Sequence, residues 1–282
     1  MEEYIKKAKT LLEALPYIQQ FYSKIFVIKL GGSVASDISL KESFVRDIIL
    51  LKLIGINIIV VHGGGKEIDA LLNRLGIKIT YSKGFRLTDN KTMEVVEMVL
   101  SGKINKELVA LINKFGGKAC GLSGKDGSLI VAEKVKSINI ELGSVGAVKS
   151  VNKEILETLD RSFIPVIAPV SMNEKGETLN INADLAASAI AVAVGAEKLI
   201  MLSDQDGLLD ENGELIGSAK EKDIERLIKK GVIHGGMIPK AASCINAVKK
   251  GVKKVHIING SIPHAVLLEI FTKKGVGTQI IK

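Results

Sequence analysis

The stretches IFVIKLGGS, residues 25–33, and NIIVVHGGGK, residues 57–66, decide the fold. Each is a run of aliphatic residues that ends in consecutive glycines, and a helical pattern follows each of them. Uninterrupted aliphatic runs are typical of parallel strands that are buried on both faces. Strands, glycine turns and helices in regular alternation predict a doubly wound α/β protein, whose ligands bind at the carboxyl ends of the strands.

The same alternation continues along the rest of the chain. Strands are predicted at residues 25–30, 57–61, 163–170, 198–202, 254–258 and 277–281. Helices are predicted at residues 44–55, 66–76, 92–115, 184–194, 221–230, 240–250 and 264–271, with an interruption of the longest one near Gly102. Short segments with Gly and Asn between residues 119 and 146 favour a β-hairpin region near the ligand site.

No linker or low-complexity segment divides the chain, so two lobes on one continuous sheet are expected. The motifs described below place the lobes at residues 24–170 and 171–282. Residues 1–23 form an appended helix with an apolar stripe, and Pro16 is expected to break it. Such a stripe needs a partner surface, which is either its own domain or another subunit.

The composition points to small anions as ligands. Of 282 residues, 46% are hydrophobic but only 4% are aromatic, and the formal net charge is +8. A basic balance suits nucleic acid, an acidic membrane surface or small anions. The lysines are scattered, and no basic run is interleaved with aromatic residues. We therefore rank small anions first and nucleic acid well behind.

Cysteine usage and hydropathy indicate the compartment. Cys120 and Cys244 lie far apart in the sequence, so they suggest neither a disulfide framework nor a metal cluster, and a reducing compartment fits. The apolar stretches 163–170 and 186–196 are too short or too interrupted to span a bilayer, and the first residues do not resemble a signal peptide. We expect a soluble cytoplasmic protein that does not enter a membrane.

Glycine clusters follow the first two predicted strands. Lys29 ends the first strand, and Gly31 and Gly32 follow it, so backbone N–H groups and a mobile ammonium can approach a phosphate. Gly63, Gly64 and Gly65 open a helix after the second strand and form an anion nest. Either cluster alone is weak evidence, because a tight turn also uses glycine. Neither matches the P-loop or the G-x-G-x-x-G pattern.

Polar residues stand before two further helices. In KGFRLTD, residues 83–89, Thr88 or Asp89 would cap a helix and leave Arg86 free either to bind a carboxylate or to lie in solvent. In NINAD, residues 180–184, three polar side chains precede an Ala-rich helix, although one is enough for a cap.

Two later segments complete the set of motifs. LSDQDGLL, residues 202–209, follows a strand and is either a nucleotide loop or a plain Asp-Gly turn. GGMIPK, residues 235–240, has Pro239 near the start of a helix and Lys240 beside it. This lysine can approach a phosphate from the side opposite Lys29, or it can be solvated.

Taken in order, these segments resemble the amino-acid kinase family over essentially the whole chain, and within it the kinases that act on N-acetyl-L-glutamate. The resemblance implies an open, mostly parallel central sheet sandwiched by helices, with an extra N-terminal helix. It implies transfer of the γ-phosphoryl group of ATP, bound with Mg²⁺, to the γ-carboxylate of N-acetyl-L-glutamate in arginine biosynthesis. It implies no metal held by protein ligands.

The resemblance also implies roles for particular residues. Lys29 and Lys240 would stabilise the transferring phosphoryl group, Asp184 would orient both lysines, and Gly32 would donate a backbone N–H. The acceptor would bind to Gly64, Gly65, Arg86 and Asn180. The nucleotide would contact Ser203, Asp204, Gly207, Leu208 and Leu209. A γ-carboxylate is already ionised at pH 7, so this chemistry needs no general base.

Members of the family that arginine inhibits carry an N-terminal helix and assemble through it as a homohexamer, a trimer of dimers. The resemblance therefore implies L-arginine as an inhibitor, bound by Lys198, His256, Glu269, Gly275 and Tyr17. The chemistry is reasonable, because a carboxylate such as Glu269 can pair with a guanidinium.

Three alternatives stay open from the sequence. One is a sister kinase that acts on carbamate, aspartate or glutamate. Another is a non-catalytic sensor of amino acid and nucleotide, although a sensor has no need of both lysines and Asp184. The third is a Rossmann dehydrogenase, which the absence of a clean glycine fingerprint disfavours.

Overall fold

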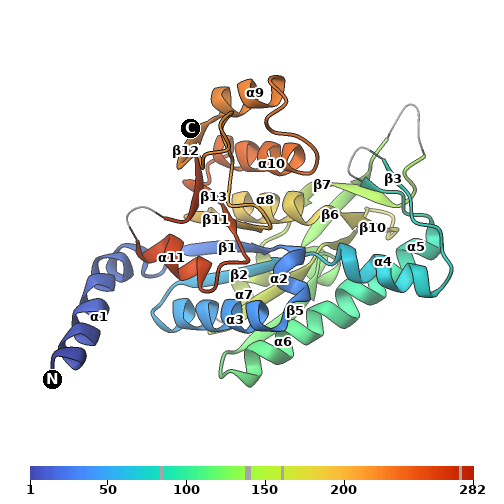
Figure 1. The fold of residues 1–282 in the computed structure, drawn as a ribbon. Helices are drawn as coiled ribbons and strands as arrows, with labels where there is room; N and C mark the ends of the chain where they lie inside the picture. The colour runs from blue at the N-terminus through green and yellow to red at the C-terminus, as the bar shows by residue number, and fades with distance from the viewer. Residues whose placement is uncertain (83–84, 137–140, 160–161, 273–274) are drawn as a thin grey trace.

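The structure, a computed structural model, describes residues 1–82, 85–136, 141–159, 162–272 and 275–282. Its centre is a sheet of eight strands in the order β12-β14-β13-β11-β1-β2-β8-β5. Figure 1 shows helices on both sides of this sheet. The strands are β1 (Ile25–Leu30), β2 (Asn57–His62), β5 (Ala119–Ser123), β8 (Ile164–Ala168), β11 (Lys198–Ser203), β12 (Ser218–Lys220), β13 (Lys254–Asn259) and β14 (Gly277–Ile281). Among the described residues of this sheet, only the β13–β14 pair is antiparallel, so the expected open and mostly parallel sheet is confirmed.

Helices cover both faces of this sheet because successive side chains of a strand point to opposite faces. Phe26 and Ile28 of β1 pack with helices α3, α6 and α11, whereas Val27 packs with α8 and α10 on the other face. These helices are α3 (Ile38–Leu53), α6 (Asn105–Lys114), α8 (Ala183–Ala193), α10 (Met237–Lys249) and α11 (Ala265–Phe271). The remaining α-helices outside the N-terminal appendage are α2 (Gly32–Ser36), α4 (Gly65–Arg74), α5 (Asn90–Glu97), α7 (Glu154–Thr158) and α9 (Glu221–Lys229).

A smaller set of strands lies beside the carboxyl end of the main sheet. A closed barrel contains β6 (Ile130–Lys134), β7 (Val145–Val151), β9 (Val170–Met172) and β10 (Thr178–Ile181), and β3 (Tyr81–Ser82) pairs with β4 (Phe85–Arg86). The predicted hairpin region is therefore only partly correct. β6 and β7 are antiparallel, but β5 pairs in parallel with β8 at the edge of the main sheet. Residues 137–140 of that region lie outside the described part of the chain.

The predicted long helix has a wide turn in its middle. After α5, residues Met98–Ile104 form a π-helix, labelled η1, and α6 continues from Asn105. The interruption predicted near Gly102 is thus confirmed. Asp89, one of the two predicted caps, accepts a hydrogen bond from the Thr92 N–H at 2.8 Å. Farther up the chain, α3 starts before its predicted first residue because Asp37 caps it by accepting from the Leu40 N–H at 2.9 Å.

The N-terminal helix α1 (Glu2–Phe21) extends away from the sheet (Figure 1). It runs through Pro16 without a break, so the predicted interruption is wrong. The carbonyl that loses a partner to Pro16 belongs to Leu12, which is exposed and open to water. Phe21 is buried against Phe26, but most of the apolar stripe, including Leu11 at 74% exposure, faces solvent. The helix does not cover its own domain with this stripe.

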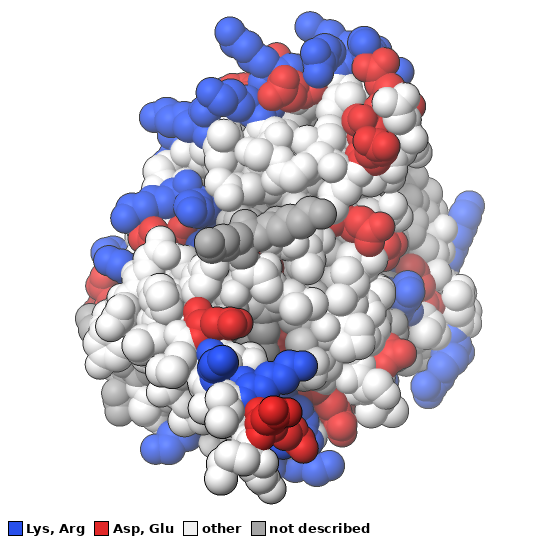
Figure 2. Space-filling view, turned by 60° about the vertical axis from the view of Figure 1, so that its left-hand side comes forward, with Lys and Arg blue, Asp and Glu red and all other residues white. Residues whose placement is uncertain are grey.

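The surface is charged with both signs. On the face in Figure 2, lysine and arginine side chains are spread over the surface and alternate with acidic ones. Exposed ion pairs form between opposite charges of the molecule, such as Lys230 with Glu211 and Lys249 with Glu221. No helix within the described ranges combines the length and the apolar character that crossing a membrane requires.

Candidate active site

A cavity of about 240 Å³ lies at the carboxyl ends of β1 and β2, where the sequence predicts the ligand site. Helix α8 begins at its rim, and β10 contributes another wall. The cavity brings together seven of the predicted site residues, which are Lys29, Gly32, Gly64, Gly65, Arg86, Asn180 and Asp184. These residues come from segments far apart in the sequence, and only the strand order makes them neighbours.

One carboxylate holds two lysines at this rim. The Lys29 Nζ lies 2.8 Å from Asp184 Oδ1, and the Lys240 Nζ lies 2.9 Å from Asp184 Oδ2. Asn182 leaves Asp184 available for this contact, because Asn182 itself caps α8 by accepting from the Asp184 N–H at 2.9 Å. Pro239 stands in the first turn of α10, as predicted, and so places Lys240 on the helix that packs against α8.

Burial and charge act in opposite directions on this triad. Burial alone would raise the pKa of Asp184, but Lys29 and Lys240 outweigh it and lower that pKa to about 2. Burial also lowers the pKa of Lys29, which Asp184 partly offsets and the like charge of Lys240 reinforces. The carboxylate is therefore ionised at neutral pH. Two cationic groups side by side on one anion leave excess positive charge facing the cavity, which suits a phosphoryl group.

The glycines are required by close approaches of the backbone. A Cβ atom on Gly31 would lie 2.4 Å from the Leu202 carbonyl oxygen, and one on Gly64 would lie 2.2 Å from Ile104 Cδ1. Gly64 is the N-cap of α4, and Gly65 is its first residue. Backbone N–H groups at such a helix start attract anions. The second glycine cluster thus lies where the lysines already concentrate positive charge.

Arg86 is neither free nor solvated. Its side chain is buried, forms an ion pair with Asp69 of α4, and donates from Nη2 to the Gly65 carbonyl oxygen at 3.0 Å. Its guanidinium also lies 4.8 Å from the centre of the Tyr81 ring. The alternative in which Arg86 lies in solvent is therefore wrong, because the side chain is buried and paired with Asp69. Lys83 and Gly84 of the same motif lie outside the described residues.

Asp69 is a site residue that the sequence analysis missed. It follows the glycine nest by about one helical turn, so its position on the helix that the nest opens was the available signal. Asn180, by contrast, was predicted and lines the cavity, with its Nδ2 3.4 Å from Thr88 Oγ1.

The predicted nucleotide loop starts at the carboxyl end of β11, next to β1. Leu208 is buried, and its N–H donates to Thr278 Oγ1 at 2.8 Å. Gly207 has a φ of 151°, and a Cβ atom there would lie 2.5 Å from the same hydroxyl. Ser203 is buried, Asp204 is exposed and Leu209 is half-buried. None of these five residues lines the 240 Å³ cavity, but their loop lies at the neighbouring strand end.

The residues predicted for arginine form a second group, where α1 meets α11. The His256 Nδ1 lies 2.5 Å from Glu269 Oε1, and Glu269 Oε2 accepts from the Val276 N–H at 2.9 Å. A Cβ atom on Gly275 would lie 2.7 Å from that same Oε2. Burial lowers the pKa of Lys198 to about 8, which Glu269 partly opposes. Tyr17 of α1 packs edge-on against Phe271 of α11, with ring centres 6.2 Å apart.

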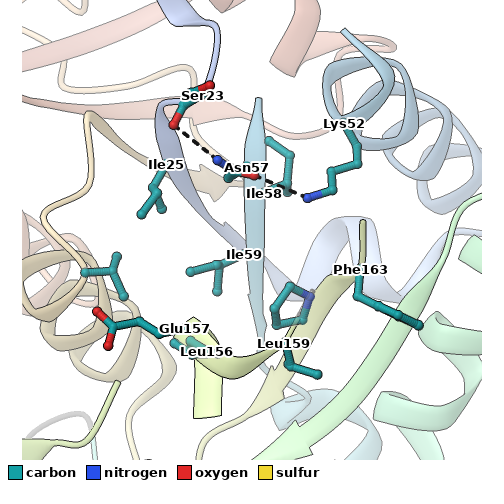
Figure 3. Close-up of a pocket in the computed structure, with 12 residues that line it drawn as sticks. Ser23, Ile25, Lys52, Asn57, Ile58, Ile59, Leu156, Glu157, Leu159 and Phe163 are labelled. Carbon is teal, nitrogen blue, oxygen red and sulfur yellow. Dashed lines mark hydrogen bonds between the residues drawn. The ribbon is translucent and has the colours of Figure 1, made fainter. Parts of the chain in front are cut away.

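A larger cavity, of about 370 Å³, lies at the amino ends of β1 and β2. Figure 3 shows its aliphatic wall, with Ile25 and Ile59 facing the space and Lys52 pointing toward Asn57. It has no pair of lysines on one carboxylate and no glycine cluster. Ligands of open α/β sheets bind at the carboxyl ends of the strands, and so the smaller cavity is the candidate active site.

No group of three His, Cys, Asp or Glu side chains within the described ranges is arranged to hold a metal ion. Asp184, the acidic side chain that lines the smaller cavity, is paired with two lysines, and Asp69 beside it is paired with Arg86.

Comparison with known proteins identifies the family. The amino acid kinase family pattern matches residues 24–259. An acetylglutamate kinase of Aquifex aeolicus (strain VF5) is 54% identical, with 99% of each chain covered, and one of Geobacter metallireducens (strain ATCC 53774 / DSM 7210 / GS-15) is 52% identical, also with 99% of each covered. The structure of an N-acetylglutamate synthase from Neisseria gonorrhoeae complexed with coenzyme A and N-acetyl-glutamate superposes with a TM-score of 0.86 at 25% identity, covering 98% of this chain but 63% of that one.

The chain therefore belongs to the amino acid kinase family, as its motifs indicated. It is an ATP-dependent kinase, and the dehydrogenase alternative is wrong.

The triad makes a prediction for stability. Asp184→Asn should lower the free energy of unfolding at pH 7, because it leaves two buried ammonium groups without a counter-charge. The folded pKa of about 2 lies below the ordinary value of 3.8, so the contribution of the charge is present at neutral pH and is lost as the pH falls toward 2. The contribution of the Asp184 charge to the free energy of unfolding is on the order of 2 kcal/mol.

Urea unfolding of the wild type and of Asp184→Asn between neutral and acid pH measures this effect. The difference in free energy of unfolding between the wild type and Asp184→Asn should become smaller as the pH falls. The control Glu225→Gln, at an exposed position of α9, should have the same free energy of unfolding as the wild type. A difference that does not depend on pH contradicts the charge pairing.

Proposed function

We propose that this kinase transfers the γ-phosphoryl group of ATP to the γ-carboxylate of N-acetyl-L-glutamate and gives N-acetyl-L-glutamyl 5-phosphate for arginine biosynthesis. The observation that carries the chemistry is the pair of buried lysines on Asp184, beside a glycine nest at the strand ends. The choice of acceptor is supported by full-length relatives named acetylglutamate kinase at 50–54% identity.

In this proposal catalysis consists of positioning and charge neutralisation. Lys29 and Lys240 stabilise the negative charge that spreads over the phosphoryl oxygens during transfer. Asp184 holds both ammonium groups in place beforehand, so little reorganisation accompanies the reaction. Gly32 donates a backbone N–H to the same group. The attacking γ-carboxylate carries its charge already at pH 7, and no general base takes part.

The acceptor binds to Gly64, Gly65, Arg86 and Asn180 in this proposal. Arg86 has five N–H donors, of which Asp69 and the Gly65 carbonyl engage only part, so others remain for the α-carboxylate. Because Asp69 and Tyr81 fix the guanidinium plane, the arginine is rigid before the acceptor arrives. A preorganised donor costs less ordering entropy on binding than a mobile one.

The nucleotide lies on the other lobe. Residues 24–170 bind the acceptor, with Asn180 added from the second lobe, and residues 171–282 bind ATP through the loop with Ser203, Asp204, Gly207, Leu208 and Leu209. Mg²⁺ would accompany ATP, and phosphate oxygens and water would be its main ligands, as is usual in phosphoryl-transfer sites. The reaction takes place in the cytoplasm.

The two-lysine mechanism predicts the kinetics of Lys29→Ala and Lys240→Ala. Each should lower kcat by on the order of 10²- to 10³-fold, because the lost charge acts mainly in the transition state. Binding of N-acetyl-L-glutamate by calorimetry should change little. An ADP-release assay with N-acetyl-L-glutamate, glutamate, aspartate and carbamate in parallel identifies the acceptor.

Near wild-type turnover in either lysine variant would end this mechanism. Activity on glutamate, aspartate or carbamate in place of N-acetyl-L-glutamate would instead keep the mechanism and reassign the protein to a sister kinase.

Arg86→Lys tests the acceptor side. An ammonium cannot reproduce a bidentate fork on a carboxylate, so the KM for N-acetyl-L-glutamate should rise by about tenfold or more while the KM for ATP stays close to the wild type. Asp69→Asn should also raise the KM for N-acetyl-L-glutamate, because it removes the ion pair that holds Arg86 in place. An unchanged acceptor KM in both variants means that Arg86 does not bind the acceptor.

We also propose that arginine inhibits this enzyme and that it assembles as a hexamer, a trimer of dimers, through α1. The exposed stripe of α1 supports this, because Leu11 and Leu12 are 74% and 65% exposed and a solvated apolar stripe needs a partner. The group of Lys198, His256, Glu269, Gly275 and Tyr17 supports an arginine site at the junction of α1 and α11. Arginine bound there would stabilise a more open arrangement of the lobes.

Two variants test this regulation. Removal of residues 1–23 should leave an active dimer with a weakened response to arginine, and Leu11→Asp with Leu12→Asp should do the same without removing the buried Phe21. Lys9→Ala is the matched control on an exposed, polar position of the same helix. Sedimentation and arginine titration are measured on all four proteins. A full-length dimer that is indifferent to millimolar arginine contradicts the regulatory proposal and leaves the kinase intact.

A further inference from the structure

Two buried polar side chains lie directly behind the glycine nest and have no role in the mechanism above. His62, the last residue of β2, is fully buried, and Asn105, the first residue of α6, is 1% exposed. The Asn105 Nδ2 lies 3.2 Å from the His62 Nε2. The His62 Nδ1 in turn lies 3.1 Å from the carbonyl oxygen of Gly63. The chain of contacts thus ends on the backbone of the nest.

These contacts define the tautomer of His62. A carbonyl oxygen only accepts, so Nδ1 carries the hydrogen and donates it to the Gly63 oxygen. Nε2 is then the acceptor for an N–H of Asn105. Burial, with a small contribution from the nearby charge of Lys106, lowers the pKa of His62 to about 4, although the Gly63 carbonyl opposes this. The ring is neutral at pH 7 and keeps this tautomer.

Asn105 is itself anchored on three strands. Besides His62 on β2, its Nδ2 reaches the Leu122 carbonyl of β5 at 3.2 Å and the Val166 carbonyl of β8 at 2.9 Å. Its Oδ1 accepts from Lys106 Nζ at 3.2 Å. The side chain has little freedom to rotate, because every polar atom has a partner. It therefore fixes the His62 ring relative to the sheet.

The π-helix η1 directly precedes Asn105 in the sequence, and its side chains pack against the glycine nest. A Cβ atom on Gly64 would lie 2.8 Å from Leu100 Cδ2 and 2.2 Å from Ile104 Cδ1, and both leucine and isoleucine belong to η1. Leu100 also lines the cavity. Turns of this wide type occur often at functional sites. One segment thus supplies both the packing on Gly64 and the polar side chain that holds His62.

We infer that His62 and Asn105 are positioning residues, which direct the Gly64 N–H toward the reacting groups; this inference rests on the phosphoryl transfer proposed above. The Gly63–Gly64 peptide unit is planar and trans, so its C=O and its N–H point in opposite directions. His62 holds the C=O on the buried side. The N–H is thereby turned to the opposite side, where Gly63, Gly64 and Gly65 line the cavity.

A purely space-filling role for these residues is a poor explanation. Burying an imidazole and an amide costs free energy that leucine at the same positions would avoid, unless the polar atoms are needed. Here each polar atom of the His62 and Asn105 side chains has a partner, and the last hydrogen bond of the chain falls on a peptide of the nest.

The inference is tested with two substitutions at one position. In His62→Asn the amide Nδ2 can take the place of Nδ1 and still donate to the Gly63 oxygen, whereas His62→Leu cannot donate at all. We expect kcat to fall by about 10- to 100-fold in His62→Leu and by less than about fivefold in His62→Asn, since loss of one aimed donor costs up to 10²- to 10³-fold. Asn105→Leu should resemble His62→Leu.

Three further readouts separate positioning from general destabilisation. Leu108→Ala, in the buried core of α6, is the control that lowers the melting temperature without touching the nest, and its kcat should stay near that of the wild type. The KM for ATP should stay unchanged in all variants. The Gly64 amide resonance in the unliganded protein should shift in His62→Leu and in Asn105→Leu, and should return toward its wild-type position in His62→Asn.

The outcomes are distinct. If His62→Leu and His62→Asn have the same kcat, or if kcat follows the melting temperature across all variants including Leu108→Ala, the inference is overturned. An unshifted Gly64 resonance in His62→Leu overturns it as well. The resonance does not depend on turnover. A wild type that phosphorylates no acceptor therefore refutes the proposed function, while the Gly64 shift still decides whether His62 orients the nest.

Discussion

The contact of Asp184 with Lys29 and Lys240 is the constraint on which the site depends. Two ammonium groups cannot lie side by side at about 10% exposure without a counter-charge, and one carboxylate provides it for both. To make the contact, β1, the start of α8 and the start of α10 must meet at one point. The packing of α10 on α8, and of α8 on the sheet, can therefore be understood as support for this single carboxylate.

The glycine segments bring backbone N–H groups close to the place where Lys29 and Lys240 meet Asp184. At Gly31 and Gly64 neighbouring atoms leave no room for a Cβ, so the main chain itself forms the wall. Side chains of the surrounding elements contact these segments and the arginine beside them. Arg86 is fixed by Asp69 and Tyr81, and the nest is contacted from behind by His62. These side chains therefore already have protein partners in the structure without ligands, which suits a reaction that proceeds by charge stabilisation.

Much of this was readable in the sequence, and the misses have physical causes. The strands before the glycine clusters were located correctly because aliphatic runs and Gly-rich turns are local signals. The β-hairpin region expected at residues 119–146 was correct for β6 and β7 but wrong for β5, because a five-residue strand does not reveal whether its partner is parallel or antiparallel. Pro16 was expected to break α1, but the exposed helix retains its direction because water can satisfy the freed carbonyl. Asp69 and Asn105 were missed because an acid or amide within a helix is usually solvated.

By itself, the sequence determined the alternation of strands and helices, the glycine turns, the helix start near Asn182, the place of Pro239 in the first turn of α10, and the charged side chains available at strand ends. These depend on contacts within a few residues, and local propensity and hydrogen bonding decide them. Only the tertiary structure decided the strand order, and hence that Lys240 meets Lys29 on Asp184, that Arg86 is bound rather than solvated, and that α1 leaves its apolar stripe exposed. Those outcomes depend on which surfaces, far apart in the sequence, pack against each other. The period of a hydrophobic pattern shows which face of a helix or strand is buried, but not which other element covers that face.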